Sequence, residues 1–532
     1  MTGRPVVAAE RAGIPVRLAR AARQHWAAGL LAIVALATGL RLWGIGFGLP
    51  YTYHPDEPLI VERALRFFAT GDLNPRWFNY PTLYTYLIAG AYRACYGLGL
   101  WGGEFSQASE MPAPQHLVMG GGFTEVPGQF LIARLVTAGL GVITVALSCY
   151  VATRLWDRRR GLLAGLFVAV SSLHAASSQM VATDVPMAFF VTLSLAFCVR
   201  LVRSGRWGDY VLAGLTAGLA MATKYNAAPV LVSLVTAHVV RSYPKLADWR
   251  LLVGLAASGV GFAVGTPYAF LEWQTFWSDV TFEMQHYAEG HPGFEGENTW
   301  WWILRVLVGQ EALLLPLGVL GGVASGLRRV KKEALPLFAF VLLYYGVVAR
   351  QVVRFSRNLV VLVPVLAILA AGFVGFLLRR AESGRYAGVV RGLVMVGLGA
   401  SLVLPLSHVI RRDRLLAGQD VRTTAAGWIR SHLETDSRIA GESYGPTLDP
   451  EVYDVQYVVR AVDHSPEWYS EQGFDYLMLS SGMYGRYYHE PERYADMVAQ
   501  YDSLFASFPT VATFEGPMSA YPEGEIVVLR VE

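Results

Sequence analysis

Two adjacent carboxylates, Asp56 and Glu57, stand in a His-Pro-Asp-Glu sequence just after the first long apolar stretch, His25–Leu49. An arginine-rich segment precedes that stretch and, by the positive-inside tendency, stays in the cytoplasm, so the acid pair emerges at the opposite membrane surface. Acidic groups held there transfer protons or bind cations, although a solvated loop is an equally good interpretation of an isolated pair. His54 could orient either carboxylate or be an ordinary loop histidine.

Two further charged residues lie at expected helix junctions. Asp184 precedes Val185-Pro186 and could be catalytic or could cap the helix that Pro186 begins. Lys224 lies in Ala-Thr-Lys-Tyr-Asn, where a cation is not needed for topology. It could bind phosphate, or its ammonium group could simply extend toward the membrane interface.

Three arginines, Arg350, Arg354 and Arg357, fall on the outer side of the expected topology, against the positive-inside trend. An anionic ligand would explain them, because a guanidinium group binds phosphate oxygens in a fork. The loop 283–297 adds His286, His291 and several carboxylates, but their spacing matches no metal-ligand signature. An ordinary polar loop is the favoured interpretation there, ahead of a lid over a substrate.

The composition indicates a membrane protein. Hydrophobic residues make up 54% of the chain and charged residues 16%, and the mean hydropathy is +0.37. The net charge is only +3, and the basic residues form short clusters between apolar runs, which excludes nucleic acid binding as a function class. The three cysteines lie in or beside apolar segments and resemble small hydrophobic residues more than a disulfide framework.

About eleven segments are apolar enough to cross a membrane. They lie near 26–46, 129–153, 162–180, 185–202, 209–223, 226–240, 251–270, 301–325, 334–349, 359–378 and 387–410. Basic clusters occur at every second turn between these segments. If the N-terminus lies in the cytoplasm, all of the clusters lie there as well. The segment 80–100 is also apolar, but its tyrosines and Arg93 favour an amphipathic helix lying at the interface.

These segments predict an α-helical polytopic membrane protein with a small extracytoplasmic α/β domain. Residues 1–24 form a cytoplasmic segment and 25–410 the transmembrane domain. The first external loop spans about 47–128, with a Gly/Pro-rich, mobile stretch at 101–128. Residues 411–532 form the soluble domain, with helices expected at 423–433 and 491–505 and strands at 438–440, 476–479 and 526–531.

The ionisable residues outside the topology clusters gather at helix ends on one side. A transporter or flippase would bury such residues near the middle of the bilayer, so this pattern favours an active site at the outer membrane boundary. A transporter of lipid-linked sugars remains the main alternative, and a scaffold that displays the C-terminal domain is a third.

The acid pair, Asp184, the Thr-Lys-Tyr sequence at 223–225, and the segments 79–86 and 354–364 together resemble the glycosyltransferase C superfamily. The resemblance covers roughly 25–410. It is closest to the bacterial relatives of dolichyl-phosphate-mannose–protein mannosyltransferases and of aminoarabinose transferases. The His-Pro-Asp-Glu sequence is also similar to that of eukaryotic mannosyltransferases of glycan-anchor assembly, which leaves the acceptor less certain.

The resemblance implies a hexosyl- or pentosyltransferase of the cytoplasmic (inner) membrane. It would transfer a sugar from a polyprenyl-phosphate donor, with inversion, to a protein, lipid or glycan acceptor at the outer face. Asp56 would be the general base, as in inverting glycoside hydrolysis. Glu57 could hold the acceptor, tune Asp56 or help bind a divalent cation; no cofactor is certain. The remaining site predictions are Asp184 as a second acid, donor-phosphate ligands Lys224, Arg354 and Arg357, and supporting residues His54, Tyr225, Arg350 and His291.

Overall fold

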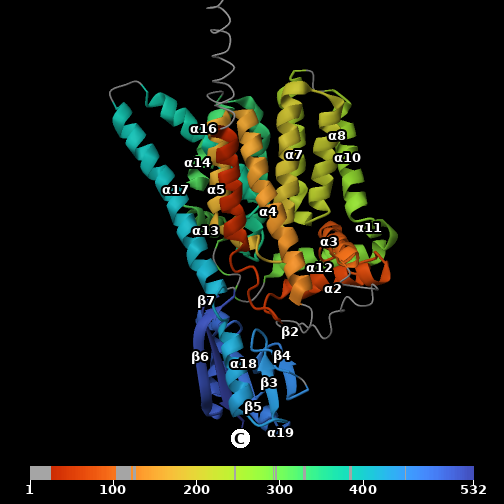
Figure 1. Cartoon of the computed structure of the whole chain (residues 1–532), viewed down its shortest axis with the longest axis vertical. Coiled ribbons are helices and arrows are strands. Elements are labelled where there is room, and N and C mark those ends of the chain that lie inside the picture. Colours follow the sequence, from red (N-terminus) through yellow and green to blue (C-terminus); the bar gives the residue numbers. More distant parts are fainter. Residues whose placement is uncertain are drawn as a thin grey trace, which may run out of the picture.

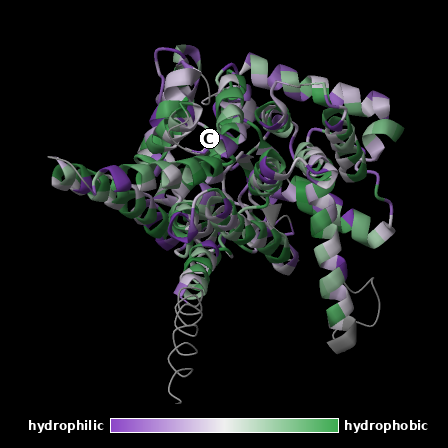
Figure 2. Ribbon diagram, turned by 90° about the horizontal axis from the view of Figure 1, so that it is seen from above, coloured by the Kyte–Doolittle hydropathy of each residue, from purple (hydrophilic) through white to green (hydrophobic). Residues whose placement is uncertain are grey.

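A computed structural model describes residues 25–102, 122–123, 127–244, 247–290, 293, 296, 298–327, 331–382, 386–449, 451–519 and 521–531. It shows a helical bundle with a small sheet domain at one end (Figure 1). Seen along the bundle axis, the helices are mostly hydrophobic (Figure 2). The prediction of an α-helical membrane protein with a small α/β domain is therefore confirmed in its main features.

Among the described residues, five helices are long and apolar enough to cross a membrane. They are His25–Leu42, α4 (Pro127–Leu155), α7 (Asp184–Ser204), α16 (Leu362–Arg380) and the helix that starts at Ala387, α17 (Ala387–Leu416). A sixth candidate is the bent pair α13 (Thr299–Glu311) and α14 (Leu314–Gly326).

The predicted count of eleven spans is not confirmed, because the other bundle helices are shorter than the roughly 20 residues that cross a bilayer. These helices are α5 (Arg158–Val170), α8 (Trp207–Met221), α9 (Leu231–Ser242), α10 (Arg250–Gly265) and α15 (Leu335–Val348). Three 3₁₀ turns join them to their neighbours: η2 (Tyr225–Val230), η3 (Lys332–Ala334) and η4 (Ser356–Leu359).

Two apolar runs that the sequence presents as continuous are broken. The run at 162–180 divides at Ser171, whose side chain accepts a hydrogen bond from the backbone of His174 and caps α6 (Ser172–Ser177). The run at 301–325 bends by 110° between α13 and α14. Ala312, at that bend, has a φ of 51°. Glu311 beside it accepts hydrogen bonds from the Ser171 side chain and the Leu173 backbone, both at 2.8 Å, which joins the two breaks.

Four helices lie around the lower end of the bundle, away from the long axis of the spans (Figure 1). They are α2 (Asp56–Thr70), α3 (Leu83–Gly102), α11 (Tyr268–Leu271) and α12 (Trp273–Glu289). α3 is not among the described helices that are long and apolar enough to cross a membrane, and the interfacial location of 80–100 stays a prediction. The segment after the first helix also contributes β1 (Tyr51–Thr52), which pairs antiparallel with β2 (Gly122–Phe123). The stretch predicted to be mobile at 101–128 and the segment predicted to be cytoplasmic at 1–24 lie largely outside the described residues.

Burial and close approach hold the bundle together. Every residue from Leu362 to Gly372 of α16 is buried, as expected for a central helix that is apolar on all sides. α8 and α10 approach through small residues: a methyl group added at Gly218 would lie 2.0 Å from the Ser258 carbonyl oxygen. Such contacts are typical of membrane helices, which associate through backbone proximity.

The C-terminal domain is a five-stranded sheet with helices on both faces. The strand order is β4-β3-β5-β7-β6, with β3 parallel to β4 and β5, and β7 antiparallel to β5 and β6. The strands are β3 (Arg438–Glu442), β4 (Asp454–Val458), β5 (Tyr476–Ser480), β6 (Thr510–Met518) and β7 (Tyr521–Arg530). The helices are α18 (Val421–His432), α19 (Pro466–Glu471), α20 (Gly485–Tyr488) and α21 (Ala495–Ser507), with the turn η5 (Ala461–Asp463).

Side chains alternate between the two faces of this sheet. Leu477 and Leu529 pack with Leu504 of α21, whereas Met478 and Val528 pack with Ile429 of α18. The predicted helices at 423–433 and 491–505 and the three predicted strands are confirmed, and the structure adds β4 and β6 at the two edges.

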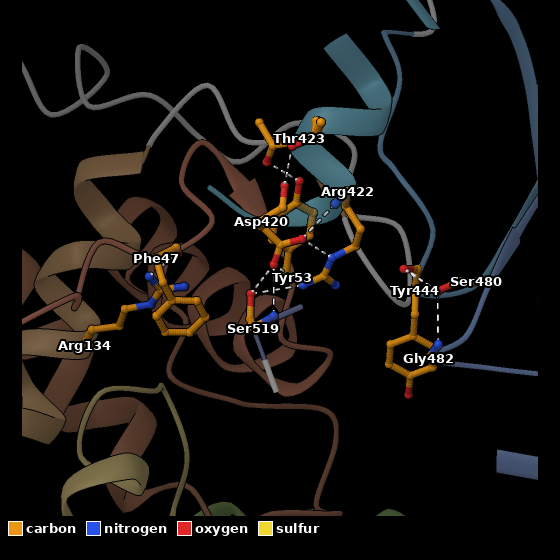
Figure 3. A network of polar contacts seen from close by, with 11 residues as sticks. Phe47, Tyr53, Arg134, Asp420, Arg422, Thr423, Tyr444, Ser480, Gly482 and Ser519 are labelled. Atoms are coloured by element: carbon orange, nitrogen blue, oxygen red, sulfur yellow. Dashed lines mark hydrogen bonds and ion pairs between the residues drawn. The ribbon is translucent and has the colours of Figure 1, made fainter. Parts of the chain in front are cut away.

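The predicted domain boundary at residue 410 falls inside α17, which continues to Leu416 before α18 begins at Val421. The junction is held by polar contacts (Figure 3). The Tyr53 hydroxyl is 2.8 Å from the Thr423 hydroxyl, and the Arg422 guanidinium lies 3.6 Å from the centre of the Tyr53 ring. The first loop of the membrane domain therefore rests directly on the C-terminal domain.

Candidate active site at the end of the bundle

The Asp56 carboxylate forms an ion pair with Arg357, which comes from η4, 301 residues further along the chain. Asp56 is the first residue of α2, where the positive end of the helix dipole favours a carboxylate. Both side chains are partly exposed, at 17% for Asp56 and 23% for Arg357. The contact brings the acid pair and the arginine segment to the same end of the bundle.

The surroundings keep Asp56 ionised. Burial would raise the pKa of its carboxyl, but Arg357, followed by His54 and Lys224, holds that pKa below its ordinary value. Burial lowers the pKa of His54, and the positive charges of Arg357 and Arg134 lower it further. Asp56 and Glu57 raise this pKa, but they do not outweigh the lowering. Neutral His54 accepts a 3.3 Å hydrogen bond at Nδ1 from the Asp56 backbone, at the start of α2.

A second polar contact joins three elements beside the first. The Lys224 ammonium donates to Asp184 Oδ1 at 2.6 Å and to Asn358 Oδ1 at 2.8 Å. Lys224 precedes η2, Asp184 begins α7 and Asn358 follows Arg357 in η4. Lys224 and Asp184 are 5% and 2% exposed. The Asn358 carbonyl also accepts from the Tyr344 hydroxyl at 2.7 Å, which holds η4 against α15.

Glu57 points into a different environment from its neighbour Asp56. Its carboxylate accepts two hydrogen bonds from Arg134, at 2.9 and 2.6 Å, and one from the Val181 backbone at 2.9 Å. Both charged side chains are 0% exposed. Arg134 also donates to the carbonyls of Ile45 and Phe47, at 2.9 and 2.8 Å. This network ties the end of the first helix to α2, α4 and the segment that leads into Asp184.

The other predicted residues are dispersed. Arg354 is 8% exposed and lies in the turn before η4, whereas Arg350 is exposed at the end of α15. The Tyr225 hydroxyl donates to the Phe78 carbonyl at 2.8 Å, so this residue faces α12 and the first loop. His291 lies outside the described residues.

Two residues that the sequence reasoning did not single out belong to these networks. Arg134 is an arginine inside an apolar span, which is costly unless it is paired, and this cost was the available signal. Asn358 follows the arginine segment directly, but a single asparagine carries no sequence signal for a contact with Lys224. Among the described residues, no group of three or more His, Cys, Asp and Glu side chains could hold a metal ion.

The arrangement of a carboxylate, a lysine and arginines suits binding of a phosphate next to a proton acceptor. Lys224 and Arg357 both act on the pKa of Asp56, so they lie within electrostatic reach of it. Arginine and lysine side chains bind phosphate oxygens strongly in partly buried sites.

The resemblance that the sequence indicates is confirmed over part of the chain by a family model and over most of the chain by the fold of solved structures. The model of the family described as dolichyl-phosphate-mannose-protein mannosyltransferase matches residues 120–265. No curated protein sequence matches the chain.

Solved structures with the same fold match a larger share of the chain than the family model does. ArnT from Cupriavidus metallidurans in the apo state is 15% identical, with a TM-score of 0.53, over 96% of this chain and 98% of that chain. Its complex with undecaprenyl phosphate gives 16% identity and a TM-score of 0.51, over 94% and 98%. The apo oligosaccharyltransferase of Archaeoglobus fulgidus gives 12% identity and a TM-score of 0.52, over 91% and 73%. At these identities the matches show a shared fold.

Proposed function

We propose that the protein transfers a sugar, with inversion, from a polyprenyl-phosphate donor to an acceptor at the outer face of the cytoplasmic membrane. The observation that carries this proposal is the Asp56–Arg357 pair with Lys224 beside it. This site holds an ionised carboxylate and phosphate-binding cations at the bundle end that carries the interfacial helices. The undecaprenyl phosphate named in the Cupriavidus structure supports the class of donor.

In this mechanism an acceptor hydroxyl or amine attacks the anomeric carbon while Asp56 accepts its proton. The bond from that carbon to the phosphate oxygen breaks, and the polyprenyl phosphate leaves with both bonding electrons. Arg357, Arg354 and Lys224 stabilise the charge that develops on the leaving phosphate. Attack from the face opposite the phosphate inverts the anomeric centre.

The ion pair gives the donor a role in activating the base. A bound phosphate competes with Asp56 for Arg357, since both are anions that the guanidinium can bind. Once Arg357 turns to the phosphate, the pKa of Asp56 rises toward its ordinary value and the carboxylate becomes a stronger base. Asp184 holds Lys224 in position, and Glu57 holds the backbone before Asp184 through Val181.

The orientation follows from the basic clusters, which place the acid pair and residues 411–532 outside. The acceptor is a protein, lipid or glycan that reaches the membrane surface there, and the sugar is a hexose or pentose.

The test compares Asp56→Asn with Glu62→Gln, which removes a charge from an exposed position of the same helix. Purified variants are incubated with a panel of polyprenyl-phosphate sugars, and release of polyprenyl phosphate and labelling of acceptors are measured. Loss of a general base should lower turnover by about 10²–10⁴-fold, whereas Glu62→Gln should retain it. Full turnover by Asp56→Asn would reject Asp56 as the base. Movement of the donor across sealed vesicles without transfer would support the transporter alternative.

A further inference from the structure

A pocket of about 330 Å³ lies between the membrane domain and the C-terminal domain, apart from the Asp56 site. Its walls come from the segment after the first helix, from α6, α13 and α17, from the link between α17 and α18, and from the end of β6. The lining residues are Phe47, Gly48, Ser172, Gln310, His408, Arg411, Arg412, Leu415, Leu416, Gly418, Asp420, Pro517, Met518 and Ser519. Figure 3 shows two of these walls, Phe47 on one side and Ser519 with Asp420 on the other.

The residues that line this pocket include polar side chains without a hydrogen-bond partner among the described residues. Arg411 is exposed, and no described residue forms a hydrogen bond or ion pair with it. His408 Nδ1 is buried without a hydrogen-bond partner. The Gln310 side-chain carbonyl accepts from the Ser172 hydroxyl at 2.8 Å, which leaves its amide group as a further donor. Arg412, also in the wall, already donates to the Gln179 side chain.

Asp420, the one acidic residue that lines the pocket, already accepts hydrogen bonds from its neighbours with both carboxylate oxygens. The Asp420 carboxylate accepts hydrogen bonds from Arg422 Nε and Nη2, both at 2.8 Å, and from the Ser519 backbone and hydroxyl, at 2.9 and 2.8 Å. Asp413 is buried against Gln179 and does not line the pocket. The groups that remain available are therefore donors and cations, and they select an anion.

The rest of the lining is apolar and lies at the membrane boundary. Phe47, Leu415, Leu416 and Met518 cover the wall beside the cations. Earlier on α17, Val403 and Leu404 are 63% and 49% exposed, on a helix that is long and apolar enough to cross a membrane. A ligand of this pocket can thus place an anionic group on Arg411 while its apolar part enters the bilayer beside α17.

We propose that this pocket binds the phosphate-bearing head group of a membrane lipid, as a second lipid-phosphate site beside the donor site. The two sites adjoin the same network, because Arg134 donates both to the Phe47 carbonyl and to Glu57, at 2.8 and 2.6 Å. This second site does not depend on Asp56 being a base.

The test uses dodecyl phosphate with a photoreactive diazirine in its chain, and the full protein in phosphatidylcholine nanodiscs. After irradiation, labelled peptides are mapped by mass spectrometry. The proposal predicts labels on residues 403–418 or 517–519, in addition to those near the Asp56 site. Labels confined to the peptides of Asp56, Lys224 and Arg357 would overturn the second site and leave the proposed function standing.

The variant His408→Gln/Arg411→Gln should weaken labelling of the pocket peptides by about tenfold or more, since it removes the positive charge of Arg411 and the imidazole of His408. Arg414→Gln, an exposed position of the same helix that does not line the pocket, is the matched control and should leave labelling unchanged. Labelling that survives the double variant, or equal labelling by the corresponding dodecyl alcohol, would overturn recognition of the phosphate. Displacement by inorganic phosphate as effective as by unlabelled dodecyl phosphate would overturn the lipid.

Discussion

The Glu57–Arg134 pair allows a direct test of whether the second carboxylate of the acid pair positions the site or acts in it. In Glu57→Gln the side chain keeps its shape, but the amide nitrogen must face a donor of Arg134 in either orientation, and in one orientation it also faces the Val181 backbone N–H. At least one hydrogen bond is lost and the Arg134 charge stays buried without a counter-charge. Breaking a fully buried pair in this way costs about 3–5 kcal/mol, a large part of the stability of a typical domain.

The apparent unfolding midpoint in mixed detergent and SDS micelles measures this loss. Glu57→Gln and Arg134→Met should each lower it strongly, whereas Glu62→Gln on the exposed face of α2 should change stability by less than about 0.5 kcal/mol. Glu57→Gln/Arg134→Met leaves neither charge unpaired, so its loss should be smaller than the sum of the two single losses by about 2–3 kcal/mol.

Turnover separates the two roles. If Glu57 positions the segment before Asp184, Glu57→Gln should reduce transfer in step with its loss of folded protein, with a further loss of up to about 10²-fold from misplacement. A variant with an unchanged unfolding midpoint and no transfer would show that Glu57 acts in the chemistry, and the positioning role would be wrong.

Three other predictions follow from separate contacts. Because Arg357 lowers the pKa of Asp56, Arg357→Gln should move the acid limb of the kcat/KM profile to higher pH; an unmoved limb would mean that Asp56 is not the titrating base. Burial raises the pKa of Glu442 from its ordinary 4.5 to about 7, so its contribution to stability is present below pH 4.5 and is lost as the pH rises through 7. Hydrogen exchange in β3 and β5, corrected for intrinsic rates, should show this slope, and Glu442→Gln should remove it. Gly218→Ala should lower stability by about 1–3 kcal/mol or more through collision with α10, while Gly208→Ala on the same helix, with nothing within 4 Å, should not, as thermal unfolding would show.

Much of the site's arrangement could be anticipated from charge distribution. The alternation of basic clusters along the chain placed the arginines near 354 on the side of Asp56, against the positive-inside trend, and the structure finds the Asp56–Arg357 contact there. The different surroundings of Asp56 and Glu57 could not be read from a sequence of two adjacent acids. Neighbours on a helix point about 100° apart, so one reaches Arg357 and the other Arg134.

The breaks in the bundle show where hydropathy stops being informative. The run at 301–325 is apolar enough for one span, and the single acidic residue Glu311 at its centre was the visible sign of the 110° bend. In the C-terminal domain the central strands were predictable from their apolar runs. β4 and β6 were not, because each lies at a sheet edge, has alternating exposure and carries several polar residues.

The short link between α17 and α18 has a practical consequence for imaging. Only residues 417–420 separate the two helices, and Tyr53 and Arg422 fasten the sheet domain to the bundle. A nanobody raised against the open edge of β6 would therefore move with the membrane-embedded part as one object. The bound nanobody would be a rigid, asymmetric feature outside the detergent micelle. It would help to align single-particle images of a helical bundle that has few features of its own outside the micelle.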